Sequence, residues 1–218
     1  MLFSSFEFLF RFLPVFLVIY YLTPKKFRNV TLLGGSIVFY TIGEAGYITI
    51  LLACVLVNYT LTRLMYRKNT DGRGIRQKRL LLLALGYDLG VLFFFKYSGL
   101  ASGLPLGISF YTFQIISYYV DVYRGEVAAE HNFVDFAAYV TMFPQLIAGP
   151  IVRFQSVQAE LKHREITWEK TGEGAARFAC GLCKKVLIAD SLAPLVSALQ
   201  NISETAAKTE AVVTTGIR

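Results

Sequence analysis

The sequence predicts an all-α protein, a polytopic transmembrane helical bundle with a broken or re-entrant segment near residues 134–151. Hydrophobic residues make up 55% of the 218-residue chain and charged residues only 17%, where soluble domains carry about 25% charged residues. Apolar runs of membrane-spanning length recur along the chain, and two prolines interrupt one of them. Because helices satisfy their own backbone hydrogen bonds within lipid, these runs are expected to be helical.

The composition also excludes several other classes of protein. The excess of hydrophobic residues rules out disorder. The 17 glycines, 6 prolines and 3 cysteines fit neither a collagen-like chain nor a disulfide scaffold. The net charge of +7 would suit nucleic acid, but the lysines and arginines lie between apolar runs, as in the cytoplasmic loops of membrane proteins. We therefore expect the lipid bilayer as a partner, and no nucleic acid.

About six to seven membrane segments are expected along the chain, drawn from seven candidate spans, since a spanning helix needs about 20 mostly apolar residues. The first is expected to be retained, because no positively charged region precedes it and no small-residue cleavage site follows it. Pro24 is expected to end that helix. Gly34 and Gly35 would allow close packing or a bend in the second, and Gly43 and Gly46 a tight turn after it. The candidate spans are approximately 6–23, 29–43, 46–66, 80–98, 106–123, 134–151 and 176–200.

The basic loops predict how these segments are oriented. Residues 67–79 carry six positive residues against Asp71, and residues 24–28 carry three, so both loops are expected on the cytoplasmic side. The N-terminus, the turn at 43–46 and the loop near 98–104 would then lie outside, and residues 124–132 inside.

The sixth segment breaks this alternation. If residues 134–151 crossed the bilayer completely, the charged stretch 153–174 would lie outside. Pro144 and Pro150 interrupt the segment, and a re-entrant path that returns to the cytoplasmic side reconciles the charges. Irregular backbone at membrane depth is tolerated only where protein or a wet cavity covers it. We therefore expect a hydrated passage here rather than a dry core.

A polar stripe is expected on the segment that begins near residue 106. Its members are spaced four, three, four and three residues apart and would share one helix face. Polar groups within a membrane are costly unless they face protein or water. Either they line a polar cavity, or Gln114 and Tyr118 bridge helices while Asp121 caps the cytoplasmic end near Arg124. The stripe consists of Gly107, Tyr111, Gln114, Tyr118 and Asp121.

A second motif, Phe143–Arg153, places Gln145 between two prolines and ends at Arg153. Each proline removes a backbone donor and frees a carbonyl upstream. The freed carbonyls and the Gln145 amide could bind a polar substrate group, or the prolines could serve only as a structural kink.

A third motif, Gly181–Leu192, carries Lys184, Lys185 and Asp190. The lysines lie six and five residues before the aspartate, about 120–140° away on an ideal α-helix, so an intrahelical salt bridge is not expected. The lysines either extend to lipid headgroups or bind an anionic ligand. Asp190 is expected to be a buried intramembrane carboxylate, which by default indicates a functional role.

Other potentially reactive residues are expected to be inert. His131 and His163 lie in charged segments and are interpreted as solvated loop residues. Cys180 and Cys183 have redox spacing but no partner cluster, so neither a metal nor a redox centre is expected. No bound cofactor is expected, because the sequence contains no phosphate-binding or dinucleotide fingerprint.

Four blocks of the sequence resemble bacterial membrane-bound O-acyltransferases, in particular the branch concerned with alginate O-acetylation. The blocks are Met1–Phe10, Pro105–Gly125, Phe143–Arg153 and Gly181–Leu192, and the resemblance covers about residues 1–195 in order. It implies an enzyme of the bacterial inner membrane. Such an enzyme moves an acetyl group from a cytoplasmic donor, acetyl-CoA or another acyl carrier, to hydroxyls of an exported cell-surface polysaccharide, or passes it to a downstream periplasmic or extracellular acetyltransferase.

The resemblance also implies a histidine that acts as general base, in an apolar segment of the C-terminal half of the family's proteins. Neither histidine here matches that context, so residues 1–200 are expected to be the N-terminal part of the domain. Residues 201–218 would lead to the missing half, and the fragment would be inactive alone. The alternative functions are a membrane transporter and a non-catalytic scaffold subunit of a polysaccharide export complex. The candidates for lining the passage or binding the donor are Gln114, Tyr118, Asp121, Gln145, Arg153, Lys184, Lys185 and Asp190.

Overall fold

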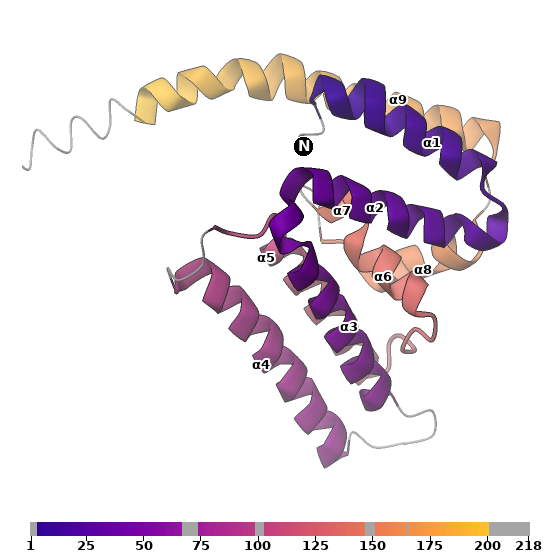
Figure 1. The fold of residues 1–218 in the computed structure, drawn as a ribbon, viewed down its shortest axis with the longest axis vertical. Helices are drawn as coiled ribbons and strands as arrows, with labels where there is room; N and C mark the ends of the chain where they lie inside the picture. The colour runs from indigo at the N-terminus through magenta and orange to yellow at the C-terminus, as the bar shows by residue number, and fades with distance from the viewer. Residues whose placement is uncertain (1–3, 67–73, 99–102, 147–150, 165, 201–218) are drawn as a thin grey trace, which may run out of the picture. The chain divides into compact units, whose positions relative to one another are not determined.

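The structure, a computed structural model, describes residues 4–66, 74–98, 103–146, 151–164 and 166–200. All regular secondary structure in these ranges is helical (Figure 1), as the sequence predicts. The chain divides into two compact units. Of the described residues, the first unit takes those within 7–164, and the second takes 166–200 together with 4–6. Each unit is described below by itself.

The first unit begins with two apolar helical hairpins joined by short turns. The π-helix η1 (Phe8–Phe12) continues into α1 (Leu13–Leu22), which ends where Thr23 becomes extended before a proline. This is the predicted stop, since the residue before proline is pushed out of the helical region. The short η2 (Lys25–Phe27) leads into α2 (Arg28–Glu44), and η3 (Ala45–Tyr47) forms the predicted turn into α3 (Ile48–Met65).

Two longer helices follow. Helix α4 (Ile75–Tyr97) begins after Gly74, whose N–H donates to the Gln77 side chain at 2.8 Å. Helix α5 (Ile108–Arg124) is flanked by two glycines in the left-handed region, Gly107 at φ +74° and Gly125 at φ +79°. Glycine adopts that conformation without steric cost. At Gly107 there is a second constraint, because an added Cβ would lie 2.4 Å from the backbone oxygen of Leu146.

The predicted break in the sixth segment is present. Helix α6 (Phe133–Thr141) ends where Met142 leaves the helical region (φ −49°, ψ 111°), and α7 (Phe143–Leu146) and α8 (Phe154–Lys162) follow. Pro144 lies in the first turn of α7, where its missing N–H costs little. It therefore starts a new helix rather than kinking a continuous one. Pro150 lies outside the described residues.

The chain from α6 to α8 goes out along α2 and comes back. At one end, the Asn29 amide donates to Asp135 of α6 at 2.7 Å and to the Leu161 carbonyl of α8 at 2.9 Å. Between these points, the Phe143 N–H donates to the Ser36 hydroxyl in the middle of α2 at 3.2 Å. Helix α6 packs along α2 (Figure 1), and α8 ends beside the part of α2 at which α6 begins. A re-entrant path through a membrane stays a prediction.

Among the described residues, the turn near 43–46 and the chain before α5, which the charge pattern assigns to a common side, contact one another. Next to the turn at 43–46, Tyr47 donates to the Gly103 carbonyl, and Glu44 accepts from the Leu106 N–H, both at 3.2 Å. Near the opposite end of α3, Tyr59 donates to the His131 carbonyl at 2.6 Å.

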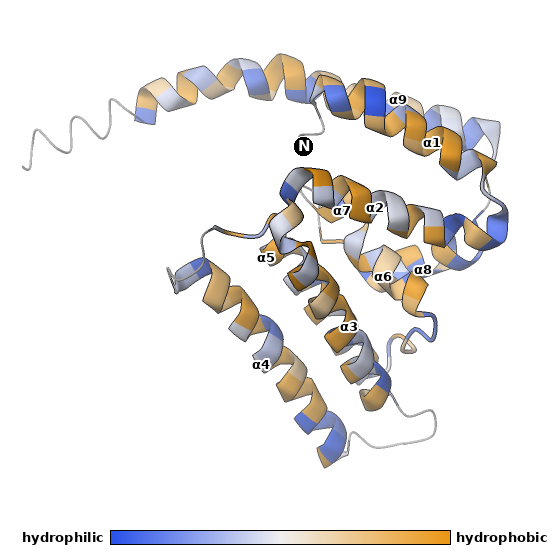
Figure 2. Cartoon of the chain, in the orientation of Figure 1, coloured by the Kyte–Doolittle hydropathy of each residue, from blue (hydrophilic) through white to orange (hydrophobic). Residues whose placement is uncertain are grey.

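Apolar side chains remain open to the surroundings of the first unit. The stretches Lys25–Met65 and Ile75–Tyr97 are long and apolar enough to cross a membrane, and Phe8–Leu22 is apolar but shorter. Only 17% of the apolar window in the second stretch is buried. Figure 2 shows hydrophobic residues over most of α4, with hydrophilic residues gathered at its start. The structure thus supports a membrane protein, whereas the total of about six to seven segments stays a prediction.

The second unit contains α9 (Trp168–Lys184) and the π-helix η4 (Lys185–Ala189), and residues 190–200 are also helical. Helix α9 begins where the Thr167 hydroxyl accepts a hydrogen bond from the Lys170 N–H at 3.2 Å, a side-chain N-cap. The expected segment 176–200 therefore lies within a longer helical stretch.

Candidate functional site

The predicted polar stripe on α5 is a buried face of that helix. Gln114, Tyr118 and Asp121 are each at most 4% exposed, and Tyr111 is 1% exposed. The spacing in the sequence thus correctly places these side chains on one protected face. Within a membrane protein such a face has to be covered by protein, water or ligand.

Two members of the stripe join α5 to the segment that runs from α6 to α8. The Gln114 amide donates to the Tyr139 carbonyl of α6 at 2.8 Å. The Tyr118 hydroxyl accepts from the Glu130 N–H at 2.8 Å, just before α6, and the Tyr118 ring packs edge-on against Phe154 with centroids 4.9 Å apart. Both residues therefore bridge helices, and a role of the same helix face in lining a passage stays a prediction.

The third member of the stripe lacks such a partner. Asp121 Oδ2 is buried without a hydrogen-bond partner among the described residues. Arg124, which was expected to lie near it, instead pairs with Glu126 at 3.8 Å. A buried acceptor left unpaired costs about 1–3 kcal/mol, so water or a ligand is the physical expectation at this oxygen.

The second motif contributes one polar group of the same kind. Gln145, on α7, is half-buried, and its Nε2 has no hydrogen-bond partner in the described part of the chain. Arg153 is exposed and lies directly before α8. The Tyr139 hydroxyl donates to the carbonyl of Val152, the residue before Arg153, at 2.8 Å. This hydrogen bond joins the chain before α8 to α6. Both candidates thus belong to the segment from α6 to α8, which Gln114 contacts through Tyr139.

The third motif differs from its prediction. Lys184, Lys185 and Asp190 lie in the second unit, within which Lys184 and Asp190 are exposed and Lys185 is partly buried, so Asp190 is not the buried carboxylate expected there. Lys185 Nζ and Asp190 Oδ2 lie 3.4 Å apart, and the prediction against an intrahelical salt bridge is wrong for this pair. The reason is the π-helix η4: the Asp190 N–H bonds to the Lys185 carbonyl, five residues back, which brings their side chains to one side. Lys185 also donates to the Ser4 hydroxyl of the same unit.

Sequence reasoning missed a buried polar pair between α3 and α4. The Asn58 amide donates to Asp88 Oδ1 at 2.7 Å and to the Cys54 carbonyl at 3.0 Å. Asn58 and Asp88 are at most 2% exposed, and Asn58 Oδ1 and Asp88 Oδ2 have no hydrogen-bond partner in the described ranges. The signal was present in the sequence, because Asp88 is an isolated carboxylate in an apolar run.

An ion pair joins the chain before α6 to the end of α8. Glu130 Oε2 lies 2.9 Å from Lys162 Nζ, and Glu130 is 4% exposed. Burial acts to raise the pKa of Glu130. The hydrogen bond and charge of Lys162, with the backbone N–H groups of Asn132 and His131, outweigh it and lower that pKa below its ordinary 4.5. His131 and His163 are both exposed, as expected of solvated loop residues.

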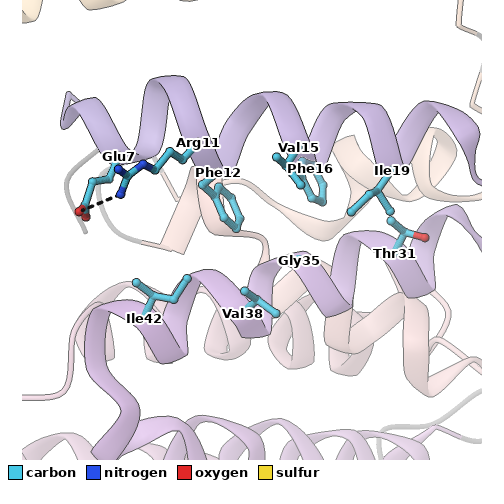
Figure 3. A pocket seen from close by; sticks show the side chains of 10 residues that line it. All are labelled: Glu7, Arg11, Phe12, Val15, Phe16, Ile19, Thr31, Gly35, Val38 and Ile42. Atoms are coloured by element: carbon cyan, nitrogen blue, oxygen red, sulfur yellow. Dashed lines mark ion pairs between the residues drawn. The ribbon is translucent and has the colours of Figure 1, made fainter.

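A groove of about 480 Å³ lies between α1 and α2 (Figure 3). Its lining is mostly apolar, with the 3.8 Å ion pair of Glu7 and Arg11 at one end. Gly35 admits the Phe16 ring into it, since an added Cβ would lie 2.3 Å from that ring. None of the eight predicted site residues lines this groove. Among the described residues, no group of three or more His, Cys, Asp or Glu side chains is arranged for a metal ion.

Comparison with known proteins adds the following. The family model "MBOAT, membrane-bound O-acyltransferase family" matches residues 37–214. The chain is 42% identical to a probable alginate O-acetylase AlgI of Pseudomonas aeruginosa, over 92% of this chain and 43% of that protein. It is also 42% identical to a probable alginate O-acetylase AlgI of Azotobacter vinelandii, over 89% of this chain and 43% of that protein.

A more distant relative is the peptidoglycan O-acetyltransferase of Helicobacter pylori, which is 29% identical over 88% of this chain and 45% of that protein. The chain thus spans less than half the length of these relatives. No solved structure matches the chain.

Proposed function

The chain belongs to the membrane-bound O-acyltransferase family, and from this premise we propose that it forms part of an inner-membrane, multi-pass enzyme that O-acetylates an exported cell-surface polysaccharide. The names of its relatives support a glycan acceptor, because one group are alginate O-acetylases and another relative is a peptidoglycan O-acetyltransferase. In this proposal the loop at 24–28 and residues 124–132 face the cytoplasm, and the N-terminus faces outside.

One observation carries the mechanistic part of the proposal: α6, α7 and α8, which we propose form a re-entrant path, contact the polar face of α5. Irregular backbone at membrane depth needs protein or a wet cavity beside it. Two buried polar atoms there, Asp121 Oδ2 and Gln145 Nε2, lack partners among the described residues. We propose that water and substrate groups satisfy them, in a passage lined by Gln114, Tyr118, Asp121, Gln145 and Arg153.

The proposed reaction is acyl transfer from a cytoplasmic donor, acetyl-CoA or another acyl carrier. The acceptor hydroxyl oxygen attacks the acyl carbonyl carbon, the new ester bond forms, and the donor thiol leaves with the proton that the hydroxyl gives up. The histidine base that the family implies is not assigned to any residue of this chain. Lys184 and Lys185 are proposed to hold the anionic part of the donor, since ammonium groups bind phosphate. The acetyl group goes to the glycan directly or through a downstream acetyltransferase outside the membrane.

A chimera tests this proposal in a protein of the relatives' length. This chain replaces the matching 43% of the Pseudomonas aeruginosa alginate O-acetylase, and alginate acetyl content is measured in a strain that lacks the native protein. We expect the chimera to restore acetylation, and Asp121→Leu in the chimera to reduce it at least tenfold. The matched control is Val18→Ala on the exposed side of α1, which leaves acetylation unchanged.

The alternatives predict different results in the same experiment. A scaffold would retain acetylation when all the polar residues of the proposed passage are replaced. Absence of acetylation from a chimera that reaches the membrane in normal amount would contradict the proposal.

A further inference from the structure

A cationic cluster lies where α1 ends, α2 begins and α8 ends. Its centre is the ring of Tyr20, with the Arg28 guanidinium carbon 5.9 Å and the Arg164 guanidinium carbon 5.7 Å from the ring centroid. Lys25 and Lys26, in η2 directly before α2, are exposed next to Arg28 in the chain. We call Tyr20, Lys25, Lys26, Arg28 and Arg164 the Tyr20 cluster.

The arginine from α8 is fixed in place by the protein. Arg164 donates through Nε to the Glu160 carbonyl at 3.1 Å, through Nη2 to Asn29 at 3.1 Å, and through Nη1 to the Tyr20 hydroxyl. Asn29 is itself held by Asp135 and by the Leu161 carbonyl. The position of this guanidinium is therefore set by three elements of the fold.

The arginine from α2 keeps most of its hydrogen-bonding capacity. Arg28 donates through Nε to the Thr23 carbonyl at a long 3.4 Å. No other hydrogen bond of Arg28 occurs within the described ranges, so the terminal N–H groups of its fork are available to a ligand. Stacking over Tyr20 restrains the guanidinium without using those groups.

The charge of the cluster is not neutralised by the described residues. None of its four cations forms an ion pair there, whereas the neighbouring Lys162 is paired with Glu130 at 2.9 Å. The carboxylate that touches the cluster, Asp135, does so only through Asn29. The first turn of α2 contains no acidic residue, and its N-cap residue, Phe27, makes no side-chain cap hydrogen bond. The positive end of the helix dipole thus adds to the charge.

From this arrangement we infer that the Tyr20 cluster is a binding site for a phosphate group. The planar fork of Arg28 matches phosphate oxygens in a bidentate manner, and the fixed guanidinium of Arg164 adds a second positive charge at the same Tyr20 ring. The positive end of the α2 dipole favours the same ligand. Two sources carry this chemistry, the headgroup of an anionic phospholipid and a soluble phosphorylated compound. This inference does not depend on the proposed acetyl transfer, because the experiment that tests it measures only phosphate binding.

The test measures phosphate binding by the purified chain in dodecyl maltoside. One arm adds phosphatidylglycerol, with a glucosyl diacylglycerol as the phosphate-free lipid, and counts bound lipid by native mass spectrometry. The other arm titrates inorganic pyrophosphate by calorimetry in the absence of phospholipid. Each arm compares wild type with the double variant Arg28→Gln/Arg164→Gln and with the matched control Arg76→Gln/Arg79→Gln, which removes two exposed cations at the start of α4.

We expect the Arg28→Gln/Arg164→Gln variant to bind phosphate about tenfold more weakly or worse, since a charge-assisted hydrogen bond contributes about 1.5–3 kcal/mol. The control is expected to bind as wild type does. Loss in the lipid arm alone identifies a headgroup, and loss in the pyrophosphate arm alone identifies a soluble ligand. Equal binding by wild type and the arginine variant in both arms, or an equal loss in the control, would overturn the inference.

A second variant guards against misfolding. Arg28→Lys/Arg164→Lys keeps both charges and loses only the forks, so it is expected to fold and to bind with intermediate strength. If it binds as tightly as wild type, the arginine forks are not the recognition element and the inference fails.

Discussion

At the scale of single residues, the first unit is notable for polar atoms held inside an apolar protein. Asn58 and Asp88 bond to one another across α3 and α4, and Gln114 and Tyr118 bond to the segment around α6. Others, such as Asp121 Oδ2, are buried without a partner among the described residues. The paired groups are expected to contribute to stability, whereas the unpaired ones are expected to serve ligand or water.

The Asn58–Asp88 pair gives a stability prediction. Asp88→Leu removes the acceptor of the Asn58 amide and is expected to destabilise the protein by about 1–3 kcal/mol. Asp88→Asn keeps an oxygen at that place and is expected to cost less than half as much. Thermal unfolding in detergent measures both, and equal melting temperatures for the two variants would rule out the hydrogen bond as a stabilising contact.

Glu130 gives a pH prediction. Its pKa is lowered in the folded protein, so its contribution is fully present above its ordinary pKa of 4.5 and is lost as the pH falls through the lower folded value. Glu130→Gln is expected to destabilise the protein at neutral pH by about 1–3 kcal/mol. The difference from wild type is expected to shrink steadily below pH 4.5. Unfolding measured across this range would contradict the pairing with Lys162 if the difference were constant.

At the scale of elements, the sequence predicts helix ends and breaks better than it predicts side-chain surroundings. Pro24 and Pro144 act locally through backbone geometry, so the stop after α1 and the break after α6 could be anticipated. The π-helix that begins at Lys185 could not be anticipated from the sequence, because nothing in its residues distinguishes it from an α-helix. Its hydrogen bond spans five residues rather than the four of an α-helix, and this pairs Lys185 with Asp190.

The contact between α5 and α7 can be tested through the two glycines that flank α5. Gly107→Ala places a Cβ 2.4 Å from the Leu146 backbone oxygen and also strains the backbone, because Gly107 is left-handed. The Cβ of Gly125→Ala meets nothing within 4 Å, so that variant adds only the backbone strain. Left-handed non-glycine residues cost about 1–3 kcal/mol. We therefore expect Gly107→Ala to be clearly the more destabilising in thermal unfolding. Equal effects would indicate that α7 does not press against the start of α5.

At the scale of the whole molecule, charge and hydrophobicity predict an all-helical membrane protein with a break near residues 134–151, and the structure is all-helical in the described ranges with such a break after α6. They do not predict long-range partners. The Asn29–Asp135 bond joins residues that are far apart in sequence, and residue spacing carries no information about such pairs. The same holds for the Tyr20 cluster, whose arginines come from α2 and α8. The family, in contrast, could be identified from local motifs, because those motifs are contiguous in the chain.

The central claim is that the polar face of α5 and the re-entrant segment enclose a hydrated passage. Cysteine accessibility tests it most directly, in a background where Cys54, Cys180 and Cys183 are replaced. Gln114→Cys, Asp121→Cys and Gln145→Cys are each treated with a charged, membrane-impermeant thiol reagent, and Ile115→Cys, fully buried on α5, is the control. We predict that the three polar positions react while Ile115→Cys does not. If all four cysteines are equally unreactive in the folded protein, the interior is dry and the account is wrong.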